Sequence, residues 1–149
     1  MRSIRNILKS VTSSAGRLSG RGKKKRLLTL SGENGGLQLA LQPGSIYYIE
    51  SEDNYVGVWY ESSDGGLLRA SLRCSLRHAE EAAAGTSLLR CHRRYIVNLD
   101  KVQVLLRQGR GFEIELMPPP KGNARKGFRT LIPVSATYAK AVSDKIEGR

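Results

Sequence analysis

The sequence predicts a mainly β domain with one helix in the middle of the chain and one near its C-terminus. Most of the chain consists of short β-branched, aromatic and aliphatic runs, separated by turn signals built from Gly, Pro, Asn and Asp. Outside these runs, apolar residues recur with helical spacing over two longer stretches, one in the middle of the chain and one near its C-terminus. The 149 residues, of which 40% are hydrophobic, suffice for one ordinary domain with a core.

The β-prone runs are taken in chain order. Pro43-Gly44 and Asp64-Gly65-Gly66 mark two of the turns between them, and Pro133 is expected to end the last strand. We expect strands over residues 26–30, 37–41, 46–49, 55–60, 67–71, 95–99, 102–106, 112–116 and 128–132.

The two helices are predicted from a change of period. Over residues 72–84, apolar side chains recur at i, i+4, i+7 and i+11, and Gly85 interrupts the pattern. Over residues 137–146 an apolar stripe returns, with Ser135 as the expected N-cap.

The positive charge is concentrated at the N-terminus. The chain holds 25 basic and 13 acidic residues, for a net charge of +12, and points to a polyanionic partner. Residues 1–26 contain nine of the basic groups and no acid, which leaves 16 basic against 13 acidic groups, or +3, for the rest. We therefore expect residues 1–24 to form a basic flexible tail or linker, or a short amphipathic helix, and residues 25–147 to form the domain.

Catalytic and cofactor chemistry find little support. Cys91 and His92 are adjacent, so in an extended segment their side chains point to opposite faces and make a poor nucleophile–base pair. No metal-ligand spacing and no phosphate-binding Gly-Lys-Ser/Thr motif is present, so we expect no enzyme, cofactor or metal site. Cys74 and Cys91 are expected to be free, buried thiols of a cytoplasmic protein, and no apolar run is long enough to cross a membrane.

The strongest functional signal is a basic cluster directly before the strand expected over residues 95–99. It consists of Arg90, His92, Arg93 and Arg94. Arg and Asn side chains match the edges of guanine and adenine, which makes Asn54, Arg93 and Arg94 candidate base readers. Arg69, Arg73 and Lys140 are candidate phosphate contacts. His92 could contact phosphate when protonated, or hold its loop by a hydrogen bond. Tyr95 and Asn98, by contrast, are expected to be structural.

Four segments, in this order, resemble the LytTR family of bacterial DNA-binding domains, which usually form the output half of two-component response regulators. They are Ser45–Ser51 with Asp53–Val56, Leu68–Leu72, Arg90–Asn98 and Ile132–Ser135. The resemblance implies an elongated arrangement of small stacked antiparallel sheets that inserts loops into successive grooves of DNA. It implies that Asn54 and Tyr55 enter a major groove, that His92 and Arg93 approach the backbone and minor groove, and that the segment after Ser135 enters the next major groove.

The sequence departs from the family pattern at two of these positions. Ala136 stands where the family usually has Arg, and Ala cannot donate to a guanine. Arg94 stands where the family usually has Ser. The resemblance therefore implies a stronger grip on phosphate and altered base discrimination at one half of the site.

The expected function is sequence-specific binding of double-stranded DNA in bacterial transcription regulation. Repeated half-sites and a second copy of the chain on DNA are expected, with control by an upstream receiver or membrane sensor module that this chain lacks. The alternative is a non-enzymatic protein- or membrane-surface module whose basic tail binds polyanions. Deletion of residues 1–24 separates the two, because only a tail-driven binder would lose nearly all affinity.

Overall fold

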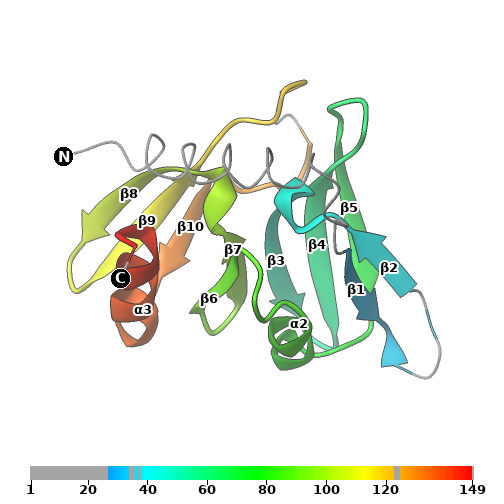
Figure 1. Cartoon of the computed structure of the whole chain (residues 1–149), viewed down its shortest axis with the longest axis horizontal. Helices are drawn as coiled ribbons and strands as arrows, with labels where there is room; N and C mark the ends of the chain where they lie inside the picture. The colour runs from blue at the N-terminus through cyan, green and yellow to red at the C-terminus, as the bar shows by residue number, and fades with distance from the viewer. Residues whose placement is uncertain (1–26, 34–35, 37, 123–124, 149) are drawn as a thin grey trace.

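The computed structural model describes residues 27–33, 36, 38–122 and 125–148, so the predicted tail over residues 1–24 lies outside the described residues. Within the described part, the strands form three antiparallel sheets with two α-helices (Figure 1). The elements are β1 (Leu28–Ser31), β2 (Gln38–Leu41), β3 (Ile46–Glu52), β4 (Tyr55–Glu61), β5 (Leu67–Leu72), α2 (Leu76–Ala82), β6 (Leu88–His92), β7 (Tyr95–Asn98), β8 (Val102–Gln108), β9 (Gly111–Leu116), β10 (Leu131–Val134) and α3 (Ala136–Ile146).

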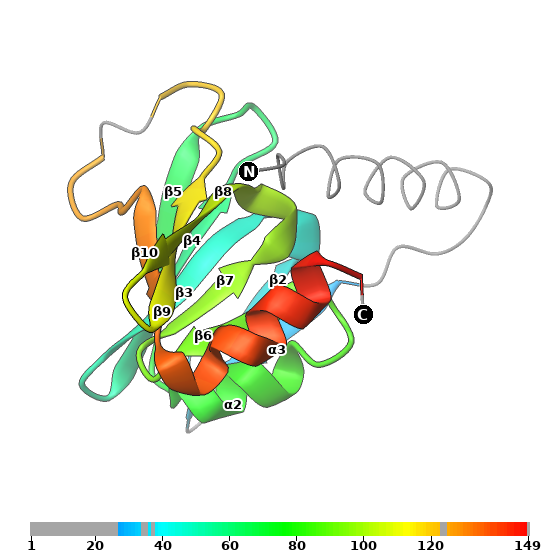
Figure 2. The same ribbon diagram turned by 90° about the vertical axis from the view of Figure 1, so that its left-hand side faces the viewer.

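The central sheet has the strand order β5-β4-β3-β7-β6 and separates two hydrophobic cores. On one face, Tyr48, Trp59 and Val97 pack with the three-stranded sheet β10-β9-β8 and with α3. On the other face, Ile49, Val58 and their neighbours pack with β1, β2 and α2. Because successive strand residues alternate between faces, burial of both faces makes β3, β4 and β7 almost continuously apolar. Figure 2 shows α3 packed over the β6 side of the sheet.

An aromatic cluster fastens the long connection between β9 and β10 to the central sheet. The ring of Phe128 lies 5.5 Å from that of Tyr47, 5.6 Å from Tyr48 and 5.4 Å from Trp59, measured between centroids. The Tyr48 hydroxyl accepts a hydrogen bond of 2.8 Å from the backbone N–H of Arg129. The contacts with Tyr47 and Trp59 are edge-to-face, a geometry that stabilises beyond the burial of ring area alone.

Three expectations about the elements are wrong. The first helix begins at Leu76, not at residue 72, because Leu72 pairs with Val56 in β5 and the Ser75 hydroxyl caps the helix by accepting from the His78 N–H at 3.0 Å. Residues 88–92, for which the sequence predicts no strand, form β6. Pro133 lies inside β10 instead of ending the strand. Because β10 is an edge strand, proline is tolerated there: no strand pairs with the open side of β10, so the missing N–H of Pro133 costs no hydrogen bond on that side.

Candidate nucleic-acid interface

Three connections meet along one edge of the molecule. They are the β3–β4 turn, the β6–β7 turn and the junction of β10 with α3, and together we call residues 53–55, 92–94 and 135–136 the turn edge (lower edge in Figure 1). Main-chain hydrogen bonds tie them together. The N–H of Ser51 donates to the carbonyl of Arg94 at 3.0 Å, and the N–H of Ser135 donates to the carbonyl of Cys91 at 3.1 Å. The spacing between the three connections is therefore set by backbone contacts.

The β3–β4 turn presents Asn54 and Tyr55. Glu52 pairs with Tyr55 across the hairpin, so Asp53 and Asn54 form a two-residue turn, and Asp53 adopts a left-handed φ of 53°. Asn54 is exposed, and the Tyr55 side chain is 44% exposed. The Arg73 guanidinium lies 5.7 Å from the centre of the Tyr55 ring, and 4.0 Å separates it from the Glu33 carboxylate. Arg73 therefore adds a solvent-accessible cation to this end of the sheet.

Arg69 is bound within the sheet surface. Its guanidinium forms an ion pair with Glu52, donates to the Ser71 hydroxyl at 2.9 Å and lies over the Trp59 ring at 5.7 Å. A side chain at Gly57 would occupy the same space as the guanidinium. The Arg69 side chain is only 23% exposed, so its charge is already compensated by Glu52.

The β6–β7 turn is held by Arg90, a role that the sequence pattern alone does not indicate. The Arg90 Nε donates to the carbonyl of His92 at 2.8 Å, and one terminal nitrogen donates to the carbonyl of Arg93 at 2.7 Å. The other terminal nitrogen pairs with Glu80 of α2 at 2.9 Å. The only sequence signal for this role is an acidic residue on the preceding helix, since a planar guanidinium matches such a set of acceptors.

The charge of the turn itself is carried by Arg93 and Arg94. Both side chains are exposed, and neither forms an ion pair within the part of the chain that the structure describes. One terminal nitrogen of Arg94 donates to the Ser51 carbonyl at 3.4 Å, which orients it toward the β3–β4 hairpin. Two adjacent uncompensated guanidiniums on a fixed turn favour an anionic ligand.

His92 holds this turn in its neutral form. Its Nδ1 accepts a hydrogen bond of 3.1 Å from the backbone N–H of Arg94. Burial, and then the charges of Arg93, Arg94 and Arg90, lower the pKa of His92 below its usual value. A neutral ring that accepts at Nδ1 carries its proton on Nε2, which remains a donor. Of the two roles that the sequence left open, the hydrogen bond that holds the loop is the one observed.

The β10–α3 junction places Ser135, Ala136 and Lys140 at the other end of the turn edge. Ser135 is the N-cap residue of α3, as predicted, but its side chain makes no capping hydrogen bond. Ala136 is the exposed first residue of the helix, one turn before Lys140. The Lys140 side chain is 88% exposed, and its ammonium pairs with Asp144 at 2.8 Å. A weak surface pair of this kind leaves Lys140 free to exchange partners.

Two predicted structural residues are confirmed. Tyr95 is 7% exposed. Asn98 is fully buried, where its amide donates to the carbonyls of Pro43 and Ile46 and its oxygen accepts from Ser87 and from the N–H of Asp100.

The chemistry of the cysteines is that of core residues. Cys74 and Cys91 are both free and buried, as predicted. Burial raises the pKa of the Cys91 thiol to about 12, which is unfavourable for a nucleophile. Among residues 27–33, 36, 38–122 and 125–148, no three His, Cys, Asp or Glu side chains gather where they could hold a metal ion, and no helix has the length and apolarity to span a membrane.

Comparison with known proteins gives two matches. A family model described as the LytTr DNA-binding domain matches residues 38–147. Among solved structures, the chain is similar to the LytTr DNA-binding domain of a methyl-accepting/DNA response regulator from Bacillus cereus, with 22% sequence identity and a TM-score of 0.57. This similarity covers 85% of the present chain and 100% of the Bacillus cereus chain, and it confirms the expected fold class. No curated protein matches the sequence.

Proposed function

Because the chain belongs to the LytTr DNA-binding domain family, whose role is DNA binding in transcription regulation, we propose that its turn edge binds duplex DNA sequence-specifically. The three connections of that edge face successive grooves of the duplex. The observation that carries the proposal is that main-chain hydrogen bonds join β3 to the β6–β7 turn and β6 to the β10–α3 junction, along an edge where Arg93 and Arg94 are exposed and form no ion pair among the described residues. A rigid element behind charged, exposed turns is the arrangement that loop-mediated DNA recognition requires.

Each turn has its own chemical task in this proposal. Asn54, whose amide suits adenine, enters one major groove together with Tyr55. Arg93 and Arg94 neutralise phosphates and approach the minor groove, where the Nε2–H of His92 adds a neutral donor. The start of α3 enters the next major groove.

The remaining candidate residues support these contacts. Arg73 and Lys140 are exposed and bind phosphate at the two ends of the edge. Arg69 orders the Glu52 side chain next to the β3–β4 turn, so its contribution is to position that turn. Arg90 positions the β6–β7 turn in the same way.

The wider setting follows from the same proposal. Two copies of the chain bind repeated half-sites on one face of the duplex, which is how a small reader gains specificity. An upstream receiver or membrane sensor module controls them in the cytoplasm, as part of a bacterial signalling system. Residues 25–147 form the DNA-binding unit.

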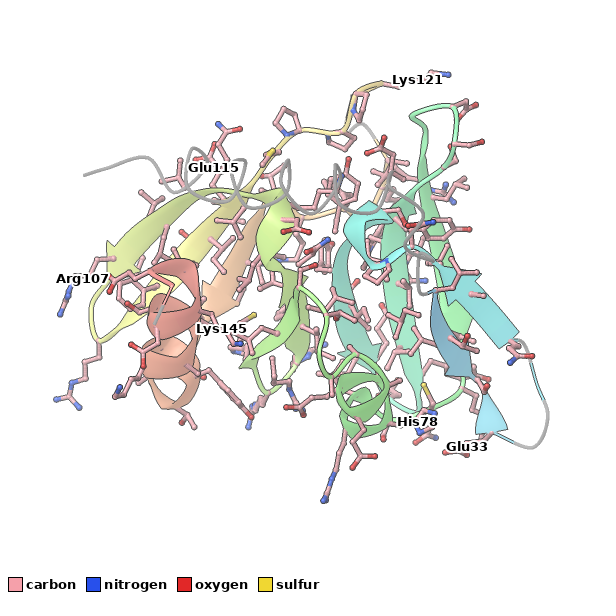
Figure 3. All side chains as sticks on the ribbon, in the orientation of Figure 1. Glu33, His78, Arg107, Glu115, Lys121 and Lys145 are labelled. Carbon is pink, nitrogen blue, oxygen red and sulfur yellow. The ribbon has the colours of Figure 1, made fainter. Side chains whose placement is uncertain are left out.

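The test is a selection of binding sites by the full chain from a random duplex library at about 0.15 M salt, where unspecific cationic binding weakens. Enrichment of a short repeated motif is expected. On the enriched duplex, Arg93→Gln should weaken binding about tenfold. Lys121→Gln is the matched control, because it removes the same charge from a side chain at the opposite end of the molecule (Figure 3) and should leave affinity unchanged.

The basic tail provides the second arm of this test. Deletion of residues 1–24 should lower overall affinity and salt dependence but keep the preference for the enriched motif. Loss of all binding on deletion, together with an unchanged affinity of Arg93→Gln, would refute the proposal and favour a module whose tail binds polyanions.

A further inference from the structure

We propose that Arg110, on the β8–β9 turn, supplies the DNA contact that Ala136 cannot make at the start of α3. The inference rests on the proposed function and adds a fourth segment to the turn edge. Its ligand is an acceptor on the duplex, either a phosphate oxygen or the edge of a guanine, since a guanidinium donates to both.

The two residues line the same surface hollow. This hollow, of about 460 Å³, lies between the β8–β9 turn and the β10–α3 junction and is lined among others by Arg110, Glu113, Pro133, Ser135 and Ala136. Figure 2 shows the β8–β9 turn beside the start of α3. A cation on the turn is therefore presented at the same place as a side chain on the first residue of the helix.

The β8–β9 turn is seated firmly against this junction. Gln108 pairs with Gly111, so the turn consists of Gly109 and Arg110, and Gly109 adopts a left-handed φ of 58°. A Cβ at Gly111 would clash with the carbonyl oxygen of Val134, which means that the hairpin touches the end of β10 at backbone distance. The Arg110 side chain thus extends from a backbone whose position relative to α3 is set.

Position, not charge, selects Arg110 rather than Arg107 on the same hairpin. Both side chains are exposed and neither forms an ion pair among the described residues, but only Arg110 lines the hollow, whereas the Arg107 guanidinium lies over the Phe112 ring at 5.9 Å. Arg110 and Glu113 are the two charged residues that line the hollow, and because the Glu113 carboxylate repels a phosphate, Arg110 is the side chain there that can attract one. The uncapped Ser135 hydroxyl lines the same hollow and offers one further donor.

The experiment measures affinity of the full chain for the duplex that the wild-type chain enriches. Arg110→Gln should weaken binding about tenfold, and Arg107→Gln, the matched control on the same hairpin, should change it less than about twofold. Adding Ala136→Arg to Arg110→Gln should restore most of the affinity, because the new guanidinium starts from the other wall of the hollow. Thermal unfolding of each variant confirms that it folds.

Two further measurements identify the acceptor. If Arg110 binds phosphate, its removal weakens binding to all sequences equally and lowers the slope of log K against log salt concentration by about one. If Arg110 binds guanine, a selection with Arg110→Gln loses preference at one position of the motif. Either result supports the inference.

The outcomes that overturn the inference are distinct from those that overturn the proposed function. Wild-type affinity of Arg110→Gln, with weak binding by Arg93→Gln, refutes the role of Arg110 and leaves DNA reading by the turn edge intact. Failure of Ala136→Arg to rescue Arg110→Gln refutes the shared position. Wild-type affinity of both Arg93→Gln and Arg110→Gln means that the proposed function itself is wrong.

Discussion

Arg90→Gln is expected to destabilise the domain by about 2–3 kcal/mol. The Arg90 side chain is 15% exposed, and its guanidinium makes three hydrogen bonds of 2.7–2.9 Å, two of them to carbonyls of the β6–β7 turn. Each charge-assisted bond to a turn carbonyl contributes about 1 kcal/mol once water competes for the acceptor. The pair with the half-exposed Glu80 adds about 0.5 kcal/mol, because solvent screens it. The midpoint of thermal unfolding should fall by about 10 °C.

The assay is urea unfolding of the full chain, with Arg77→Gln as the matched control. Arg77 also pairs with a glutamate, Glu81, but its side chain is 85% exposed, so its loss should cost less than about 0.5 kcal/mol. Arg90→Lys keeps the charge but cannot serve three acceptors, and should recover less than half of the loss. Equal stability of Arg90→Gln and Arg77→Gln, or full recovery by lysine, would refute the assignment of Arg90 as the support of this turn.

The other predictions concern stability and pH. Asn98→Ala should cost about 3 kcal/mol in urea unfolding, because the buried amide satisfies two carbonyls and two donors, and a loss below about 1 kcal/mol would contradict that role. Gly111→Ala should lower the free energy of unfolding by about 2 kcal/mol, because the new methyl group would clash with the Val134 carbonyl. Gly44→Ala is the control, since its methyl group would point into open space, and equal effects of the two variants would count against the close approach of Gly111 to Val134. The lowered pKa of His92 means that the unfolded chain takes up the proton first, so stability should fall between about pH 7 and pH 5, and more steeply than in His92→Gln. An NMR titration of His92 with a midpoint above about 6.5 would show the opposite sign.

Most strands could be predicted because the turn residues between them are chemically specific. The exceptions show where local pattern stops being informative. β6 carries polar side chains at Arg90 and His92 and includes a bulge, so its alternation is broken and only tertiary pairing with β7 identifies it as a strand. Pro133 is compatible with a strand only because β10 lies at a sheet edge, and edge position is a property of the whole fold.

The candidate site could be predicted as a set of turns but not as a network. The sequence shows that basic residues gather before β7, and the structure brings that turn next to the β3–β4 turn and to α3. Nothing in the local sequence separates Arg90, which pairs with Glu80, from Arg93, which forms no ion pair among the described residues, because both are arginines within four positions. The distinction depends on Glu80, which is ten residues away in the chain and contacts only one of them.

Trp59 gives the domain an intrinsic optical probe. It is the only tryptophan of the chain, and its indole is 1% exposed, with Nε1 donating to Glu50 at 3.3 Å. The ring contacts Phe128 of the long β9–β10 connection and also Arg69, whose partner Glu52 precedes the β3–β4 turn. The emission of Trp59 should therefore respond to the docking of that connection. If DNA binds at the turn edge as proposed, it should also respond to any rearrangement of Arg69, so that unlabelled protein reports both binding and unfolding.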